Sequence, residues 1–144
     1  MTTAIAHPNI ALVKYWGKQN HILNYPASPS LSITLDSLIT KTKVSASTET
    51  RLLLNGKRNE DLNVAKFLEL FREKFKLPPV CVETDNNFPT GAGLASSASG
   101  FAALVTALNE NFQLGLSLSS LSEWARRGSA SAARSIFGLS LIHI

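Results

Sequence analysis

Residues 87–100 read Asn-Phe-Pro-Thr-Gly-Ala-Gly-Leu-Ala-Ser-Ser-Ala-Ser-Gly, and they lead from a strand pattern into a long apolar helix pattern. Gly91 and Gly93 allow the backbone to bend and a ligand to approach closely. The helix expected over residues 93–112 presents free N–H groups and the positive end of its dipole here, which suits an anion. The segment predicts a phosphate-binding loop made of Pro89, Gly91, Ala92, Gly93, Leu94, Ala95, Ser96, Ser97 and Ser99.

Other interpretations of this loop are weaker. It is no Walker A loop, because no Gly-Lys-Ser/Thr closes it, and it lacks the acid that a Rossmann fingerprint places about 20 residues further on. A glycine- and serine-rich loop can also do no more than cap a buried helix. The density of hydroxyls at the start of an otherwise apolar helix favours phosphate binding.

The segments before and after this loop alternate between strand and helix patterns. Alternating apolar residues predict strands over residues 30–36, 41–47, 51–54 and 80–84, with a tight turn at Asn55-Gly56. A period of three to four residues predicts an amphipathic helix over residues 64–75. A last helix is expected over residues 118–127, where Ser120 and Glu123 have capping-box spacing. The mixture predicts an α+β fold, a two-layer sandwich of sheet and helices.

Composition narrows the class of ligand. The chain has 144 residues, 44% of them hydrophobic and 17% charged, which is typical of one domain with a buried core. Most acids fall between Asp36 and Asp85, whereas the first segment and the last third are basic. This distribution favours an anionic small molecule over a metal cage or a paired-carboxylate hydrolase. We predict no metal site in the protein, no nucleic-acid partner and no membrane segment, and a cytoplasmic location.

Three motifs together resemble a known family. The loop at residues 89–99 resembles the phosphate-binding loop of the superfamily of galactokinase, homoserine kinase, mevalonate kinase and phosphomevalonate kinase. The segments Ala-His-Pro-Asn-Ile-Ala-Leu-Val-Lys-Tyr-Trp-Gly-Lys at residues 6–18 and Ala-Arg-Arg-Gly-Ser-Ala-Ser-Ala-Ala-Arg at residues 125–134 are similar to the mevalonate diphosphate decarboxylases. The resemblance covers nearly everything from Thr3 to Gly138.

The resemblance implies roles for individual residues. Lys14 matches a lysine at the reaction centre that stabilises developing negative charge, and Asn24 matches a polar position nearby. The remaining substrate-binding positions are implied at Tyr15, Trp16, Gly17, Lys18, Ser129, Ala130, Ser131, Ala132, Ala133 and Arg134. Ala130 stands where glycine is usual in the family, and Ala133 where cysteine is usual. In isolation, the lysine-rich segment could instead be an exposed strand end, and the alanine and serine run a packed core helix.

The implied activity is the ATP- and Mg²⁺-dependent decarboxylation of 5-diphosphomevalonate to isopentenyl diphosphate, with ADP, phosphate and CO₂ as products. The implied fold resembles the ribosomal protein S5 domain 2-like N-terminal half of the superfamily, and the full-length protein would form a homodimer. Two alternatives stay open. One is a mevalonate 3-kinase or phosphomevalonate decarboxylase of the same superfamily, and the other is a non-catalytic nucleotide-binding fragment.

Length and the end of the chain point to a fragment. Family chains are about twice as long and carry a catalytic aspartate in the C-terminal half, which no residue here matches. We expect residues 1–138 to be an incomplete N-terminal ATP- and substrate-binding domain that is inactive alone. Residues 139–144, Leu-Ser-Leu-Ile-His-Ile, can be encoded by CTGTCTCTTATACACATC, which resembles a transposon end used for sequencing libraries. We therefore expect these six residues to be a non-native tail.

Overall fold

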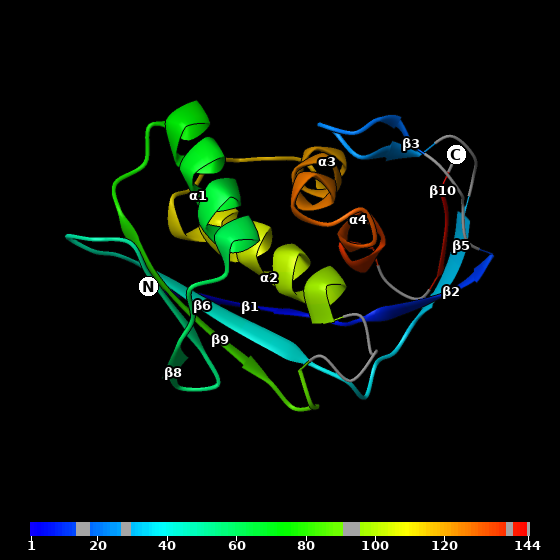
Figure 1. Ribbon diagram of the computed structural model, residues 1–144, viewed down its shortest axis with the longest axis horizontal. Helices are drawn as coiled ribbons and strands as arrows, with labels where there is room; N and C mark the ends of the chain where they lie inside the picture. The colour runs from blue at the N-terminus through cyan, green and yellow to red at the C-terminus, as the bar shows by residue number, and fades with distance from the viewer. Residues whose placement is uncertain (14–17, 27–29, 91–95, 138–139, 144) are drawn as a thin grey trace.

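Helices cover one face of a sheet in the computed structural model, which describes residues 1–13, 18–26, 30–90, 96–137 and 140–143 (Figure 1). The helices are α1 (Leu62–Phe75), α2 (Ser96–Asn111), α3 (Leu118–Gly128) and α4 (Ala132–Ser135). The strands are β1 (Thr2–Ala6), β2 (Asn9–Val13), β3 (Lys18–Asn20), β4 (Tyr25–Pro26), β5 (Ser30–Thr34), β6 (Thr40–Ala46), β7 (Arg51–Leu54), β8 (Lys57–Arg58), β9 (Val80–Asn86) and β10 (Ser140–His143).

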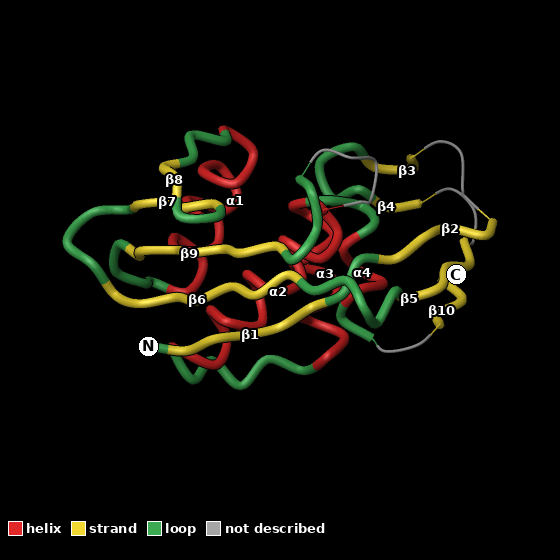
Figure 2. Tube along the Cα trace, turned by 90° about the horizontal axis from the view of Figure 1, so that it is seen from below, coloured by secondary structure: helices red, strands yellow, loops and turns green. Residues whose placement is uncertain are grey.

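The larger sheet has the order β1-β6-β9-β7-β8, and Figure 2 shows it from the side opposite the helices. β6 and β9 pair antiparallel over their whole lengths, from Thr40 opposite Asn86 to Ala46 opposite Val80. β7 joins the other edge of β9 in parallel. Because successive side chains of a strand alternate between faces, Thr40, Thr42 and Val44 of β6 all point into the core. The predicted two-layer sandwich of sheet and helices is confirmed.

Helix α2 is the centre of the core. Nine of its residues are buried, among them the fully buried Ala98, Val105 and Leu108. The helix packs on β6 and β1 with one side and on α3 and α4 with another. A helix with almost no charge has no side suited to water, so burial on several sides is the expected outcome. The predicted helix over residues 93–112 is confirmed from Ser96 to Asn111, and Phe112 lies in the turn that follows.

Aromatic side chains join α1 to α3. Phe67, Leu68 and Phe71 of α1 are buried, as the sequence periodicity predicts. The Phe71 ring lies 4.9 Å from the Trp124 ring at 72°, and the Phe67 ring lies 5.2 Å from that of Phe101 at 70°. These edge-to-face contacts add about 0.5–1.5 kcal/mol each beyond the burial of apolar area. They hold α1 across α2 and α3.

Three details differ from the sequence-based expectations. Ser117, not Ser120, caps α3: its hydroxyl accepts a bond from the Ser120 amide, although the helix begins at Leu118 as expected. The short strands β1, β2, β3, β4 and β8 were not predicted, because two to five residues give too little periodicity. β5, expected only as a strand, lies in a second sheet of order β10-β5-β2, which was not predicted.

The backbone of residues 140–143 forms β10, which pairs antiparallel with β5. The expectation that residues 139–144 are a non-native tail stays a prediction. No helix within the described ranges is long and apolar enough to cross a bilayer.

Gly128, at the end of α3, tests the packing between α3 and α2. A Cβ built on this glycine overlaps the Phe101 ring, whereas a Cβ on Gly100 meets nothing within 4 Å. Gly128→Ala should therefore lower the free energy of unfolding by about 1–3 kcal/mol through overpacking. Gly100→Ala, the matched control in the interior of α2, should raise it by roughly 0.5–1 kcal/mol. Urea unfolding followed by circular dichroism measures both, and equal stability of the two variants would contradict the packing described.

Candidate functional site

The glycine- and serine-rich loop and the alanine- and serine-rich segment at residues 125–134 meet through two serine hydroxyls, which are 32 residues apart in the sequence. Ser97, in the first turn of α2, lies with its Oγ 3.3 Å from Ser129 Oγ, at the end of α3. Ser129 Oγ is in turn 3.1 Å from Ser131 Oγ, at the start of α4. The predicted phosphate loop and the predicted substrate motif therefore converge at one place, on the N-terminal end of α2.

Asn9, a buried asparagine of β2, orients the side chain of Arg134. Its Nε donates to Asn9 Oδ1 at 3.3 Å, and the two side chains are only 6% and 3% exposed. The Asn9 amide nitrogen donates to Ser131 O at 3.0 Å and to Ser135 Oγ at 2.7 Å. One side chain thus orients the guanidinium and joins both ends of α4 to β2. A planar guanidinium held in this way is suited to a carboxylate or phosphate.

The remaining residues of this motif are small and packed. Ala132 and Ala133 of α4 are buried, while Ala130 is half-buried between the two serines. The sequence allowed either a packed core helix or a polar binding motif here, and the structure shows parts of both. The alanines pack in the core, and the serines and Arg134 form a polar cluster. The half-buried Ala130 is next to Ser129 and Ser131, so its extra methyl relative to glycine lies beside this cluster.

Asn24 and Arg126 fasten the β3–β4 hairpin to the end of α3. Asn24 has the left-handed backbone φ of 54°, which asparagine tolerates, and its amide nitrogen donates to Arg126 O at 2.9 Å. Arg126 is 7% exposed, and its Nε donates to Leu23 O at 3.1 Å. Its guanidinium also stacks on the Tyr25 ring, 4.2 Å from the centroid. This reciprocal contact positions the hairpin, whose first residue is Lys18.

Several predicted site residues lie outside the described residues. They are Lys14, Tyr15, Trp16 and Gly17 in the first motif, and Gly91, Ala92, Gly93, Leu94 and Ala95 in the loop. For Lys18 only the backbone is described, paired with Pro26. Pro89 is exposed at the start of the loop, and Ser96 is half-buried at its end. Ser99 is fully buried, with its Oγ 2.6 Å from Thr40 Oγ1.

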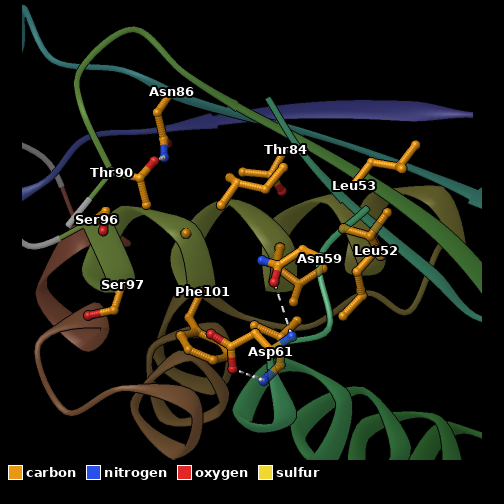
Figure 3. Close-up of a pocket in the computed structure, with 15 residues that line it drawn as sticks. Leu52, Leu53, Asn59, Asp61, Thr84, Asn86, Thr90, Ser96, Ser97 and Phe101 are labelled. Atoms are coloured by element: carbon orange, nitrogen blue, oxygen red, sulfur yellow. Dashed lines mark hydrogen bonds between the residues drawn. The ribbon is translucent and has the colours of Figure 1, made fainter. Parts of the chain in front are cut away.

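A pocket extends from Ser96 and Ser97 along α2 toward α1 (Figure 3). Its walls are mostly apolar, from β7, β9 and α2, and include Leu52, Val82 and Phe101. Two polar residues before α1, Asn59 and Asp61, close the far side. The Asn59 Oδ1 accepts from the Asp61 amide at 3.1 Å, and Asp61 Oδ1 caps α1. An apolar pocket with a few oriented polar groups beside an anion site is typical of a nucleotide site.

Sequence reasoning missed Asn9, Arg126 and the pocket. Asn9 lies within a segment that was singled out, and a lone amide in an apolar strand was an available signal for a buried polar role. The pocket had no such signal, because its walls come from four separate elements. Among the residues that the structure describes, no group of three His, Cys, Asp or Glu side chains could hold a metal ion.

A family model described as the diphosphomevalonate decarboxylase-like N-terminal domain matches residues 6–142. The chain belongs to this family. It is 45% identical over 152 residues to a diphosphomevalonate decarboxylase of Gibberella zeae, covering 90% of this chain and 40% of that protein. The chain thus spans about 40% of the length of the curated relatives it matches.

Solved structures share the fold. Mevalonate diphosphate decarboxylase from Staphylococcus aureus superposes with a TM-score of 0.90 at 41% identity, over 96% of this chain and 44% of that one. A structure described as MDDEF in complex with MVAPP, AMPPCP and magnesium superposes with a TM-score of 0.89 at 46% identity. It covers 96% of this chain and 45% of that one. The predicted resemblance to the family is confirmed.

Asn9 offers a test of the cluster around Arg134. Asn9→Ala removes the acceptor for Arg134 and the donor to Ser131 and Ser135, which leaves buried polar groups unpaired. The free energy of unfolding should fall by about 1–3 kcal/mol. Asn63→Ala, on the exposed side of α1, is the matched control and should stay within about 0.5 kcal/mol of the unsubstituted protein. A loss no greater than that of the control, in urea unfolding, would remove Asn9 from this supporting role.

Proposed function

We propose that the complete protein, with this chain as its N-terminal part, decarboxylates 5-diphosphomevalonate with ATP and Mg²⁺. Its products would be isopentenyl diphosphate, ADP, phosphate and CO₂. Family membership and the similarity to diphosphomevalonate decarboxylases support this activity. Residues 1–138 would form the incomplete ATP- and substrate-binding domain, and the C-terminal part would supply the aspartate that the reaction needs.

The contact between Ser97, Ser129 and Ser131 carries the proposal. Phosphoryl transfer depends mostly on positioning the two reactants and on stabilising charge. A nucleotide held by Ser96 and Ser97 and an anionic substrate held by Ser129 and Ser131 would meet at this contact.

ATP would lie along α2. We propose that its phosphates bind the loop of residues 89–97 and the N-terminal end of α2, and that its base enters the apolar pocket lined by Leu52, Val82 and Phe101. Ser99 would support the loop without contacting ATP, because its hydroxyl is buried and bonded to Thr40. The related structure with AMPPCP and magnesium supports nucleotide binding by this domain.

Mg²⁺ would arrive with the nucleotide. Magnesium usually keeps several waters and binds one or two protein oxygens together with substrate phosphates. The hydroxyls of Ser96 and Ser97 are oxygen donors of this kind, beside the place proposed for the phosphates. The metal would neutralise charge on the transferred phosphoryl group.

The substrate would be held by two basic segments, residues 14–18 and the region around Arg134. We propose that Arg134 binds its carboxylate, that Tyr15, Trp16, Gly17 and Lys18 bind its diphosphate, and that Lys14 stabilises negative charge at the reaction centre. Arg134 is oriented by Asn9, and the hairpin that begins at Lys18 is fastened by Arg126. The chain's own contribution is therefore to orient an anionic substrate against the ATP phosphates.

The decisive experiment compares turnover of mono- and diphosphate substrates by the complete protein. Preference for 5-diphosphomevalonate supports the proposal, and preference for the monophosphate or for mevalonate would identify one of the related activities. ATP binding without any decarboxylation would identify a nucleotide-binding module. We also propose a cytoplasmic, homodimeric protein and a non-native origin for residues 139–144. A natural stop codon directly after Ile144 would contradict the last of these.

Arg134→Lys in the complete protein should lower kcat/KM for 5-diphosphomevalonate by roughly a hundredfold. One ammonium group cannot replace the two parallel hydrogen bonds of a guanidinium, and misplacement of substrate by about 1 Å can have an effect of this size. Arg127→Lys is the matched control, because Arg127 stacks on Trp124 outside the cluster. Near-normal turnover of Arg134→Lys would remove Arg134 from the substrate site.

Ser97→Ala should raise KM for ATP more than KM for the substrate. A hydrogen bond to a charged phosphate contributes about 1.5–3 kcal/mol, so the expected increase is roughly ten- to a hundredfold. Ser119→Ala, another exposed serine in the first turn of a helix, is the control. Steady-state kinetics with each substrate varied in turn measures the effect, and an unchanged KM for ATP would show that the loop assignment is wrong.

A further inference from the structure

We propose that a series of hydrogen bonds through Ser99, Thr40, Asn86 and Thr90, buried at its Ser99–Thr40 end and exposed at Thr90, fixes the two sides of residues 91–95 relative to each other and so positions ATP. The inference rests on the proposed function, because it assigns a positioning role within the same ATP site. Thr90 directly precedes residues 91–95, and Ser99 lies in the first turns of the helix that follows them. Thr40 and Asn86 come from neighbouring strands of the sheet below.

The chain of hydrogen bonds has one direction. Thr40 Oγ1 donates to Asn86 Oδ1 at 2.6 Å and lies 2.6 Å from Ser99 Oγ. Since a hydroxyl has a single proton and that of Thr40 goes to Asn86, Ser99 is the donor in the 2.6 Å contact with Thr40, and Ser96 O, 3.3 Å from Ser99 Oγ, is a second and more distant acceptor for the same Ser99 proton. The Asn86 amide nitrogen then donates to Thr90 Oγ1 at 3.1 Å. The bonds thus run without a break from α2, through β6 and β9, to Thr90 in the first part of the loop.

Packing alone does not require these hydroxyls. Thr40 and Ser99 are both fully buried, and their neighbours on the same elements, Val44 and Ala98, are apolar and equally buried. A buried hydroxyl destabilises the fold unless it is bonded, so a valine and an alanine would fill these positions with less constraint. What the hydroxyls add is a rigid link between the two flanks. Phosphate sites need such support, because small displacements of the binding groups lower the rate.

Thr42 provides an internal comparison. It is also fully buried on β6, two residues from Thr40, and its Oγ1 lies 3.0 Å from Thr84 Oγ1 on β9. This bond joins the same two strands, but the pair bonds to neither Thr90 nor Ser99. Thr40 and Thr42 therefore share burial, strand and residue type, and they differ in their connection to the loop.

The experiment compares Thr40→Val, Thr42→Val and Thr40→Ser in the complete protein. Thr40→Val should raise KM for ATP about tenfold while KM for 5-diphosphomevalonate stays nearly constant. Thr40→Ser keeps the hydroxyl and should stay within about twofold of the unsubstituted protein. Thr42→Val loses a partly buried hydrogen bond to Thr84, which lines the apolar pocket, and should change KM for ATP by no more than about twofold because Thr84 stays paired within β9. A purely structural role would affect stability in both valine variants and KM for ATP in neither.

Ser99→Ala supplies a second, milder variant. It removes one oxygen from a helix position where alanine is favoured, so it keeps the fold even where Thr40→Val does not. The hydroxyl is fully buried, so it acts on ATP through its partners, which are Thr40 Oγ1 at 2.6 Å and the Ser96 carbonyl oxygen at 3.3 Å, and the double variant separates these two routes. The Thr40→Val/Ser99→Ala double variant should bind ATP no more weakly than whichever single variant binds ATP more weakly, because both changes interrupt the same series of hydrogen bonds.

The outcomes separate this inference from the function on which it rests. An equal KM for ATP in Thr40→Val and Thr42→Val, or additive effects in the double variant, would overturn the positioning role while decarboxylation persists. Where Thr40→Val does not fold, an unchanged KM for ATP in Ser99→Ala overturns it. Absence of decarboxylation in the unsubstituted protein would overturn the proposed function instead.

Discussion

The burial of α2 between the sheet and the other helices is the constraint on which the rest of the structure depends. The helix carries a single charged residue, Glu110, so it is stable only where other elements cover most of its surface. β1 and β6 cover it from below, and α3 and α4 from the side (Figure 1). Once it is enclosed in this way, its first turn has a defined position. Ser96 and Ser97 then lie beside the end of β9 and beside the serines that precede α4.

Hydrophobic burial places the layers, but it aligns them only loosely, because it is not directional. Buried polar side chains supply the alignment. Asn9 ties β2 to α4, Thr40 ties β6 to β9 and α2, and Arg126 ties the end of α3 to the β3–β4 hairpin. Each bond has a defined length and direction, and an unmet partner inside the core would cost about 1–3 kcal/mol. All three links lie around the place where the functional motifs meet.

The elements that could be predicted are those whose pattern is long. α1 shows four turns of apolar periodicity, and α2 shows a long apolar run after a glycine-rich segment, so both were expected at nearly their observed limits. β6 and β9 were expected as well, although β9 continues to Asn86. The start of α3 at Leu118 was expected, but its cap was not, because several serines in and before its first turn offer similar caps and only the fold selects Ser117.

The sequence by itself determined the family and the two-layer fold, and it supplied the residue types of the candidate site, because these depend on local motifs and on the apolar period. Tertiary structure alone decided which of those residues act together. Ser97 meets Ser129, Asn9 orients Arg134, and Ser99 faces Thr40 rather than the surface. These contacts join residues that are 32, 125 and 59 positions apart along the chain. Distances across such separations are set by how helices and sheet pack, and no local pattern in the sequence records them.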